Sequence, residues 1–433
     1  MRQLIGSIAL LMILIFGGGI RAQESQSFIG PETYPAGINP LTGLVVDDPA
    51  VLDRRPLMVK VINAPAEVRP QAGLMAADVV WEHLLAGGIT RFSAIYLGQE
   101  PGHVGPIRSA RLVDFELVRI YRSLFTYSGM SEGVIAILRG DGLMSSRLVG
   151  GAGPCPALCR FPDEGAKLEW TLFGDATALR EQAVVMNRDT TVEAVYGMAF
   201  SEQRPAGGVP VEGINVAYRQ TDVQWTYHPV FERWLREQDG EPHFDKATGT
   251  QINTANVLII EEDHIVQPFV HEGYWGPPNY AFSVNLIGSG RIYLFRDGRY
   301  YVGEWRREDR EDPLRFYDMD GNPLPFKPGT TFINLVPRWV DGYQLAFSLT
   351  NAPLATVVGA GSGVNLRVGP GTQYRAVGSA FSGDLLTAIG RNPSLDWVQV
   401  VKGEDILWLS ASFLSLTPGE IELLPLPRPT VER

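Results

Sequence analysis

The feature that most constrains this chain is a series of short apolar segments separated by glycine, proline, asparagine and aspartate. From residue 214 onward these segments have the length and the β-branched or aromatic content of strands. They fall at 215–219, 223–228, 231–235, 256–260, 281–286, 291–295, 300–306 and 331–336. Turn residues at 288–290 and 297–298 predict hairpins. The 47 glycines and 31 prolines also favour many strands and turns over a helical bundle.

The first half of the chain mixes two kinds of periodicity. Strand-like segments are predicted at 58–62, 78–84, 89–97 and 124–128. Apolar residues at helical spacing predict helices at 112–122, 131–139 and 176–185. The fold class is therefore predicted as α+β, with a mixed α/β N-terminal domain followed by a mostly-β second domain.

Three arginines stand close together in sequence within a chain that is acidic overall. Arg91 lies inside a predicted strand, whereas Arg108 and Arg111 directly precede the helix predicted from residue 112. Ser109 is the candidate N-cap of that helix. A helix N-terminus offers free N–H groups and a partial positive charge, so two guanidinium groups beside it predict an anion site.

Two interpretations of these arginines remain open at the level of sequence. The arginines either pair with internal carboxylates, such as Glu82 or Asp114, or bind an external carboxylate or phosphate.

A second polar candidate is the segment that contains His243 and Asp245. On a strand these two side chains share one face, where a carboxylate can orient an imidazole for acid–base chemistry. Turn formation, packing and metal binding are the alternatives for this pair.

Ordered motifs indicate a family relationship. The N-terminal motifs are Pro40-Leu-Thr-Gly-Leu, Arg55-Pro-Leu, Arg69-Pro-Gln-Ala-Gly-Leu, Ala77-Asp-Val-Val-Trp-Glu, Gly88-Ile-Thr-Arg-Phe and Gly105-Pro-Ile-Arg-Ser-Ala-Arg. Later motifs are Trp225-Thr-Tyr, Gly240-Glu-Pro-His-Phe-Asp, Thr248-Gly-Thr-Gln-Ile and Pro328-Gly-Thr. Together they resemble the YerB-like family of bacterial lipoproteins, whose two-part domain has no assigned function. The resemblance therefore implies an architecture but no activity.

The C-terminal region carries a different set of motifs. Asn365-Leu-Arg-Val-Gly-Pro-Gly, followed by Asp396-Trp-Val-Gln-Val and Trp408-Leu, is similar to the bacterial SH3-like domain. Such small β-barrels are often attached to envelope proteins, where they bind cell-wall peptides or other partners. Tyr374, Trp397 and Trp408 are the candidates for lining a groove, with core packing as the alternative role.

The N-terminus has the pattern of an export signal. Arg2 supplies a positive charge, residues 4–16 are apolar, and Ala22 offers a cleavage site. An uncleaved anchor is the alternative, and no further apolar run is long enough to span a bilayer. Because no cysteine lies near this segment, the lipid attachment of lipoprotein relatives is not expected here.

The two cysteines, Cys155 and Cys159, are separated by three residues. In an exported protein this spacing predicts a disulfide that closes a small loop. A redox site is less well supported because the spacing is not Cys-x-x-Cys, and a metal site lacks a nearby histidine. We expect no metal and no cofactor.

The chain is acidic, and its motifs predict an order of domains. Removing residues 1–22 takes away two arginines and no acid, so the net charge changes from −11 to −13, which disfavours nucleic acid as a partner. The expected order is a signal peptide at 1–22, a linker at 23–39, an α/β domain at 40–205, a β-rich domain at 212–340, a linker at 341–362, an SH3-like domain at 363–417 and a disordered proline-rich tail at 418–433.

No complete catalytic constellation is visible in the sequence. The prediction is therefore an exported, envelope-associated binding or scaffolding protein whose partner is a cell-wall peptide, a glycan or another envelope protein. The alternative is an enzyme that acts on envelope glycan or peptide, with the three arginines and Glu82 in one site and His243 contributing.

Overall fold

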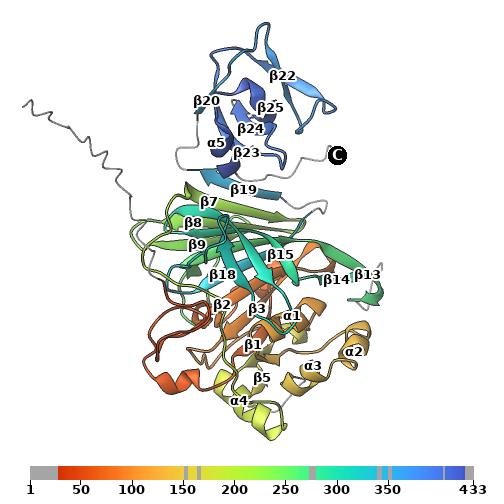
Figure 1. Cartoon of the computed structure of the whole chain (residues 1–433). Coiled ribbons are helices and arrows are strands. Elements are labelled where there is room, and N and C mark those ends of the chain that lie inside the picture. Colours follow the sequence, from red (N-terminus) through yellow and green to blue (C-terminus); the bar gives the residue numbers. More distant parts are fainter. Residues whose placement is uncertain are drawn as a thin grey trace, which may run out of the picture.

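The structure is a computed structural model that describes residues 28–150, 155–162, 167–272, 279–338, 344–349, 354–402 and 405–424. The predicted signal peptide and its cleavage site lie outside the described residues. Among the residues that are described, no helix has the length and apolarity needed to cross a bilayer. Strands dominate the architecture, helices are few, and a separate small sheet forms the C-terminal region (Figure 1).

One large sheet contains strands from both the first and the second half of the chain. Its spatial order is β10 (Glu241–Pro242), β9 (Arg233–Gln238), β8 (Thr221–His228), β7 (Val209–Tyr218), β16 (Arg299–Arg307), β15 (Gly288–Arg296), β12 (Asn256–Glu262), β18 (Thr331–Pro337), β2 (Val79–Leu84), β3 (Thr90–Tyr96), β1 (Leu57–Ile62) and β4 (Leu124–Thr126). The halves meet where β18 pairs in parallel with both β2 and β12. Outside this order, β11 (Asn253–Thr254) pairs with β9, β17 (Arg315–Asp318) pairs with β16 and β19 (Gln344–Leu349) pairs with β7.

Helices cover the end of this sheet that lies farthest from the C-terminal domain (Figure 1). They are α1 (Leu112–Ile120), α2 (Glu132–Leu138), α3 (Gly142–Arg147) and α4 (Ala176–Val185). Short 3-10 turns and two small sheets join them: η1 (Pro49–Leu52), η2 (Ala66–Val68), η3 (Leu74–Ala76), η4 (Ala86–Gly88), η6 (Leu168–Trp170), β5 (Leu158–Arg160) with β6 (Leu172–Gly174), and β13 (His264–His271) with β14 (Tyr280–Val284). The predicted helices α1, α2 and α4 are confirmed, whereas α3 was not predicted from the sequence.

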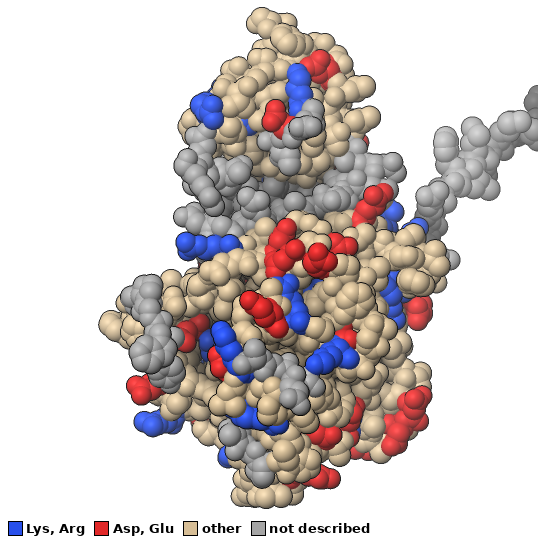
Figure 2. All heavy atoms as spheres, turned by 180° about the vertical axis from the view of Figure 1, so that it is seen from behind, with Lys and Arg blue, Asp and Glu red and all other residues tan. Residues whose placement is uncertain are grey.

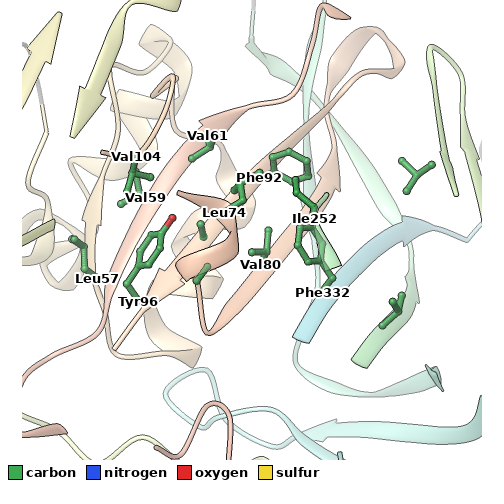
Figure 3. Close-up of a cluster of buried hydrophobic side chains, with 14 of the residues drawn as sticks. Leu57, Val59, Val61, Leu74, Val80, Phe92, Tyr96, Val104, Ile252 and Phe332 are labelled. Carbon is green, nitrogen blue, oxygen red and sulfur yellow. The ribbon is translucent and has the colours of Figure 1, made fainter. Parts of the chain in front are cut away.

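Strands β1, β2 and β3 are buried on both faces. Because side chains alternate along a strand, each strand feeds two hydrophobic clusters. Val59, Val80 and Phe92 belong to the first cluster, which also receives Trp225 and Trp234 from β8 and β9. Figure 3 shows part of this cluster, with Phe92 beside Phe332 of β18. The second cluster lies against α1 and contains Met58, Trp81 and Ile95. The first half of the fold is therefore a sheet packed on both sides.

The C-terminal domain has its own sheet and its own core. Its strand order is β20 (Leu354–Thr356), β23 (Leu385–Arg391), β24 (Trp397–Lys402), β25 (Asp405–Ser410), β21 (Val364–Arg367) and β22 (Ala376–Ala380), followed by η7 (Ala411–Phe413) and α5 (Pro418–Leu423). Val398, Val400 and Leu409 are buried at its centre. Strand β20 lies inside the expected linker 341–362, as does β19, which pairs with β7 of the main sheet.

The structure corrects the prediction that the tail is disordered from residue 418. Thr417 caps α5 by accepting a hydrogen bond from the Glu420 N–H, and Ile421 and Leu424 are buried in the core of the C-terminal domain. These two side chains anchor the segment, whereas Pro418, Glu420 and Glu422 remain exposed. Residues 425–433 lie outside the described part of the chain.

The predicted disulfide and the two predicted hairpin turns fall within the described residues. Cys155 and Cys159 form the predicted disulfide. The predicted hairpin turn at Asp297 and Gly298 is confirmed, since both residues have positive φ angles between β15 and β16. The turn predicted at 288–290 is wrong, because Gly288 already belongs to β15 and pairs with β16.

Candidate functional site

A polar cluster lies between α1 and the strands on which it packs. Alternation along β1, β2 and β3 places Lys60, His83, Arg91 and Ser93 on the same sheet face as Met58 and Trp81. The register reinforces this arrangement, since Lys60 pairs with Ser93, and His83 pairs with Arg91. Three neighbouring strands therefore direct polar side chains toward one helix.

Asp114 of α1 is the centre of this cluster. Its Oδ1 lies 2.6 Å from the Nζ of Lys60 and accepts a hydrogen bond of 2.8 Å from the hydroxyl of Ser93. The Lys60 ammonium also donates to the Ser93 Oγ at 2.9 Å and contacts the ring of His83. None of the side chains of Lys60, Ser93 and Asp114 is exposed. The cluster therefore connects β1, β3 and α1 within the core.

Burial controls protonation in this cluster. Desolvation lowers the pKa of Lys60 to about 8, although the neighbouring Asp114 carboxylate opposes the shift. Burial also holds the pKa of His83 well below its usual value, and the positive charge of Lys60 acts in the same direction. His83 is consequently neutral at physiological pH.

The other oxygen of Asp114 holds the start of α1. Its Oδ2 accepts a 2.7 Å hydrogen bond from the backbone N–H of Arg111, which is the N-cap residue. The predicted N-cap Ser109 is wrong, because the helix begins at Leu112 and the Ser109 side chain does not cap it. Instead, the Ser109 carbonyl accepts hydrogen bonds from Nη1 of Arg91 at 2.8 Å and from Nη1 of Arg111 at 3.4 Å.

The three predicted arginines come together at this helix start. Arg91 and Arg111 are 6% and 7% exposed, respectively, and Arg108 is half-buried. Burial lowers the pKa of Arg91 well below its usual value, and the nearby positive charges of Arg111 and Arg108 lower it further. Arg91 and Arg111 also meet in space, since both donate to the carbonyl of Ser109.

The arginines differ in what they contact. The Nε of Arg111 lies 3.1 Å from Oε1 of Glu272, which follows β13, and Oε2 of Glu272 accepts a 3.3 Å hydrogen bond from the Ala86 N–H of η4. The Arg108 guanidinium makes no hydrogen bond or ion pair within the described part of the chain, and its Nε is buried. Burial lowers the pKa of Arg108, and Arg111 lowers it further, whereas the exposed Glu169 opposes the shift.

Positive charge exceeds negative charge in this region. Asp114 and Glu272 are the buried carboxylates, and Glu169 contributes an exposed one. The cationic side chains are Lys60, Arg91, Arg108 and Arg111. The whole chain has a net charge of −11, and Figure 2 shows acidic and basic side chains interspersed over the described surface of one face. The excess of positive charge is therefore a local property of the arginine cluster, which we define as Arg91, Arg108 and Arg111.

Glu82 lies on the opposite face of the sheet from the arginine cluster. It is fully buried, and its Oε2 is 2.9 Å from Nη2 of Arg236, which comes from β9 in the second half of the chain. The Oε1 accepts hydrogen bonds from Asn63 at 3.0 Å and from Thr90 at 2.7 Å. The structure therefore separates Glu82 from the arginines with which the sequence grouped it.

His243 and Asp245 make separate contacts. The ring of His243 is buried, with 3.0 Å between its Nδ1 and Nε of Arg236, and 2.7 Å between its Nε2 and Oε1 of Gln71. Asp245 is also buried and accepts hydrogen bonds from backbone N–H groups, including that of Met75 at 2.9 Å. These contacts join β9 and the following turns to the segment that contains η3, and neither residue lies in the arginine cluster.

The aromatic candidates of the SH3-like domain have different exposures. Trp408 is 1% exposed, whereas Trp397 and Tyr374 are half-buried. Trp397 and Tyr374 can therefore contact a ligand at the surface, while Trp408 lies in the interior.

Sequence reasoning missed Lys60, His83 and Ser93 as members of the cluster. A lysine inside the apolar segment Leu57–Ile62 was the available signal, since a charge in a fully buried strand requires a partner. The partner, Asp114, is 54 positions away and could not be assigned from local spacing.

The fold and its candidate site define a multidomain β-rich protein in which a sheet built from two halves of the chain precedes an SH3-like barrel. Comparisons with known families agree with this description. The family described as "Protein of unknown function (DUF3048)" matches with its N-terminal domain at residues 41–184 and its C-terminal domain at residues 214–333. A bacterial SH3 domain matches residues 362–415.

The chain is also similar to "Putative lipoprotein YerB" of Bacillus subtilis (strain 168). The two are 30% identical over 314 residues, which cover 71% of this chain and 88% of the relative. The crystal structure of the YerB protein from Bacillus subtilis superposes with a TM-score of 0.59 at 27% identity, covering 71% of this chain and 99% of that structure. This chain belongs to the DUF3048 family, as its sequence motifs predicted.

Proposed function

We propose that this protein is an exported, envelope-associated binding protein whose arginine cluster takes an anionic group of its ligand. The observation that carries the proposal is Arg108, a half-buried arginine whose guanidinium has no acceptor within the described part of the chain. Buried polar groups are normally paired, and a guanidinium forms strong, directional bonds with carboxylates and phosphates. The local excess of positive charge supports the same conclusion.

The polar cluster behind the arginines favours binding over catalysis. Ser93 and Lys60 would be the nucleophile and base of a hydrolytic site, but both are fully buried and already bonded to Asp114. A nucleophile must reach its substrate. In our proposal Ser93, Lys60 and Asp114 position the arginine cluster. The alternative function is that of an enzyme acting on envelope glycan or peptide.

The C-terminal domain supplies a second contact in this proposal. Residues 40–205 and 212–340 act together through their shared sheet, and the SH3-like domain at 363–417 binds a cell-wall peptide, a glycan or an envelope protein. The half-buried side chains of Trp397 and Tyr374 are its contact candidates. Export rests on the charged and apolar pattern of residues 1–22.

The proposal is tested by titrating the purified protein with inorganic phosphate and with succinate and measuring heat release. Arg108→Ala is expected to abolish binding, while Arg139→Ala, which removes an exposed arginine after α2, leaves it unchanged. Purified cell wall is incubated with the unsubstituted protein and, separately, with Arg108→Ala to test the alternative that the protein is an enzyme. Product release that depends on Arg108 would identify an enzyme and contradict the binding-protein proposal.

A further inference from the structure

Glu272 occupies the arginine cluster with a carboxylate that belongs to the protein itself. One of its oxygens lies 3.1 Å from Nε of Arg111, and the other accepts a 3.3 Å hydrogen bond from the Ala86 N–H. The negative charge of Glu272 also acts on Arg91, whose protonated form it stabilises. A guanidinium on one oxygen and a backbone N–H on the other form a receptor for a planar, two-oxygen anion.

Glu272 directly follows β13, a strand that does not pair with the main sheet. Strands β13 and β14 form a two-stranded sheet of their own, which packs on α1 and α2. Much of β13 faces solvent, and Phe269 is 90% exposed. Packing on the two helices stabilises this hairpin, since Val270 of β13 and Ala281 of β14 are buried in the second hydrophobic cluster. The Glu272 side chain can therefore leave the arginines without breaking any pairing of the main sheet.

Charge balance distinguishes Glu272 from the other carboxylate of the region. Asp114 is fully buried within α1 and holds Lys60, Ser93 and the start of the helix. If the Asp114 carboxylate left this position, the buried ammonium of Lys60 would lose its counter-ion. Within the described part of the chain, the Glu272 carboxylate contacts Arg111 and Ala86, and an incoming carboxylate can replace both contacts. The backbone N–H of Glu272 bonds separately to the Asn279 carbonyl.

From these contacts we infer that Glu272 stands where a carboxylate of the ligand binds, so that the arginine cluster selects carboxylate ligands and Glu272 is its internal competitor. This inference rests on the proposed function, since it concerns the same arginines. The ligand carboxylate takes the position on Arg111 and Ala86, and the free guanidinium of Arg108 takes a second anionic group of the ligand. A dicarboxylate is accordingly the simplest probe.

The test compares succinate and inorganic phosphate binding by the full chain and by Glu272→Gln. Removing the competing charge is expected to tighten succinate binding about tenfold, which corresponds to about one charge-assisted hydrogen bond, and to change phosphate binding less. Glu308→Gln is the matched control, because Glu308 is exposed and the substitution removes the same charge. Amide hydrogen exchange in β13 is expected to become faster when succinate binds to the unsubstituted protein, because its carboxylate releases Glu272.

The outcomes separate this inference from the proposed function. If the unsubstituted protein binds succinate and Glu272→Gln binds it no more tightly, Glu272 is not a competitor and the inference is overturned while the anion site stands. If Glu272→Gln raises the affinity for phosphate more than the affinity for succinate, the inferred selectivity for carboxylates is overturned. If neither protein binds either anion, the proposed function itself is contradicted. A lowered melting temperature without tighter binding would assign Glu272 a structural role instead.

Discussion

The Nζ of Lys60 lies 2.6 Å from Oδ1 of Asp114, and neither side chain is exposed to solvent. This buried ion pair joins β1 to the first turn of α1. Because Oδ2 of Asp114 also holds the backbone N–H of Arg111, the pair fixes the position at which the arginines converge. An ion pair deep in the protein is therefore part of the support of the candidate site.

Breaking this pair on one side is expected to be costly. Asp114→Asn leaves the Lys60 charge buried without a counter-ion, and we expect a loss of about 3–5 kcal/mol in the free energy of unfolding. The double variant Lys60→Met/Asp114→Leu removes both charges and is expected to stay within about 2 kcal/mol of the unsubstituted protein. Urea denaturation measures both values. Equal stability of Asp114→Asn and the exposed control Asp320→Asn would contradict this account.

The lowered pKa of Lys60 predicts how stability depends on pH. The pKa is about 8 in the folded protein, against an ordinary value of 10.5 in the unfolded chain. Below pH 8, Lys60 is protonated in both states, and the full cost of burying its charge is present. Between pH 8 and pH 10.5 the unfolded chain binds more protons than the folded protein, so the contribution of Lys60 to stability rises with pH. The unsubstituted protein should therefore gain stability relative to Lys60→Met/Asp114→Leu from pH 8 to pH 10. A difference that is constant over this range would contradict the assignment.

Local sequence patterns were sufficient to predict most strands and helices of the main fold. The predicted segment 58–62 and the segments rich in β-branched and aromatic residues after residue 214 have the composition of strands, and they form strands. The pairing of β18 with β2 could not be predicted, because it joins segments about 250 residues apart and no local rule specifies a parallel partner at that distance. The resemblance to a known family predicted the order of the domains but not the pairing of β18 with β2.

The candidate site was predicted only in part, for a physical reason. The grouping of Arg91, Arg108 and Arg111 followed from their positions beside one strand and one helix start. Glu82 was placed with them, but the alternation of side chains along β2 sends Glu82 and His83 to opposite faces. Glu272 could not be predicted, since it reaches Arg111 from a hairpin in the second half of the chain.

A second buried ion pair predicts that the two halves of the main fold unfold together. Glu82 of β2 and Arg236 of β9 are 2.9 Å apart, and both are fully buried. Arg236→Ala is expected to cost about 3–5 kcal/mol and to lower a single unfolding transition that the N-terminal and C-terminal halves share. Tryptophan fluorescence and limited proteolysis of both halves measure this, with exposed Arg306→Ala as the control. Two separate transitions, with only one of them shifted, would contradict the shared unit.

The C-terminal domain is expected to need its final helix. Ile421 and Leu424 of the last described segment are 4% and 2% exposed, and both pack into the core of the domain. Burying such side chains contributes up to about 1.5–3 kcal/mol each. A fragment of residues 354–424 should therefore melt at a higher temperature than a fragment of residues 354–416. Identical melting temperatures would show that α5 adds nothing to the barrel.

The most direct test of the account compares Arg108→Ala, Arg108→Lys and Arg139→Ala in one experiment. Melting temperature is measured for each protein with and without succinate and inorganic phosphate, because a ligand that binds the folded state raises it. We predict that the unsubstituted protein and Arg139→Ala are stabilised by the anion. Arg108→Ala should lose this stabilisation while its own melting temperature changes little, and Arg108→Lys should retain at most part of it, since lysine lacks the planar fork of donors. A large fall in the melting temperature of both Arg108 variants, with no stabilisation of the unsubstituted protein by either anion, would contradict the claim that this cluster is a binding site.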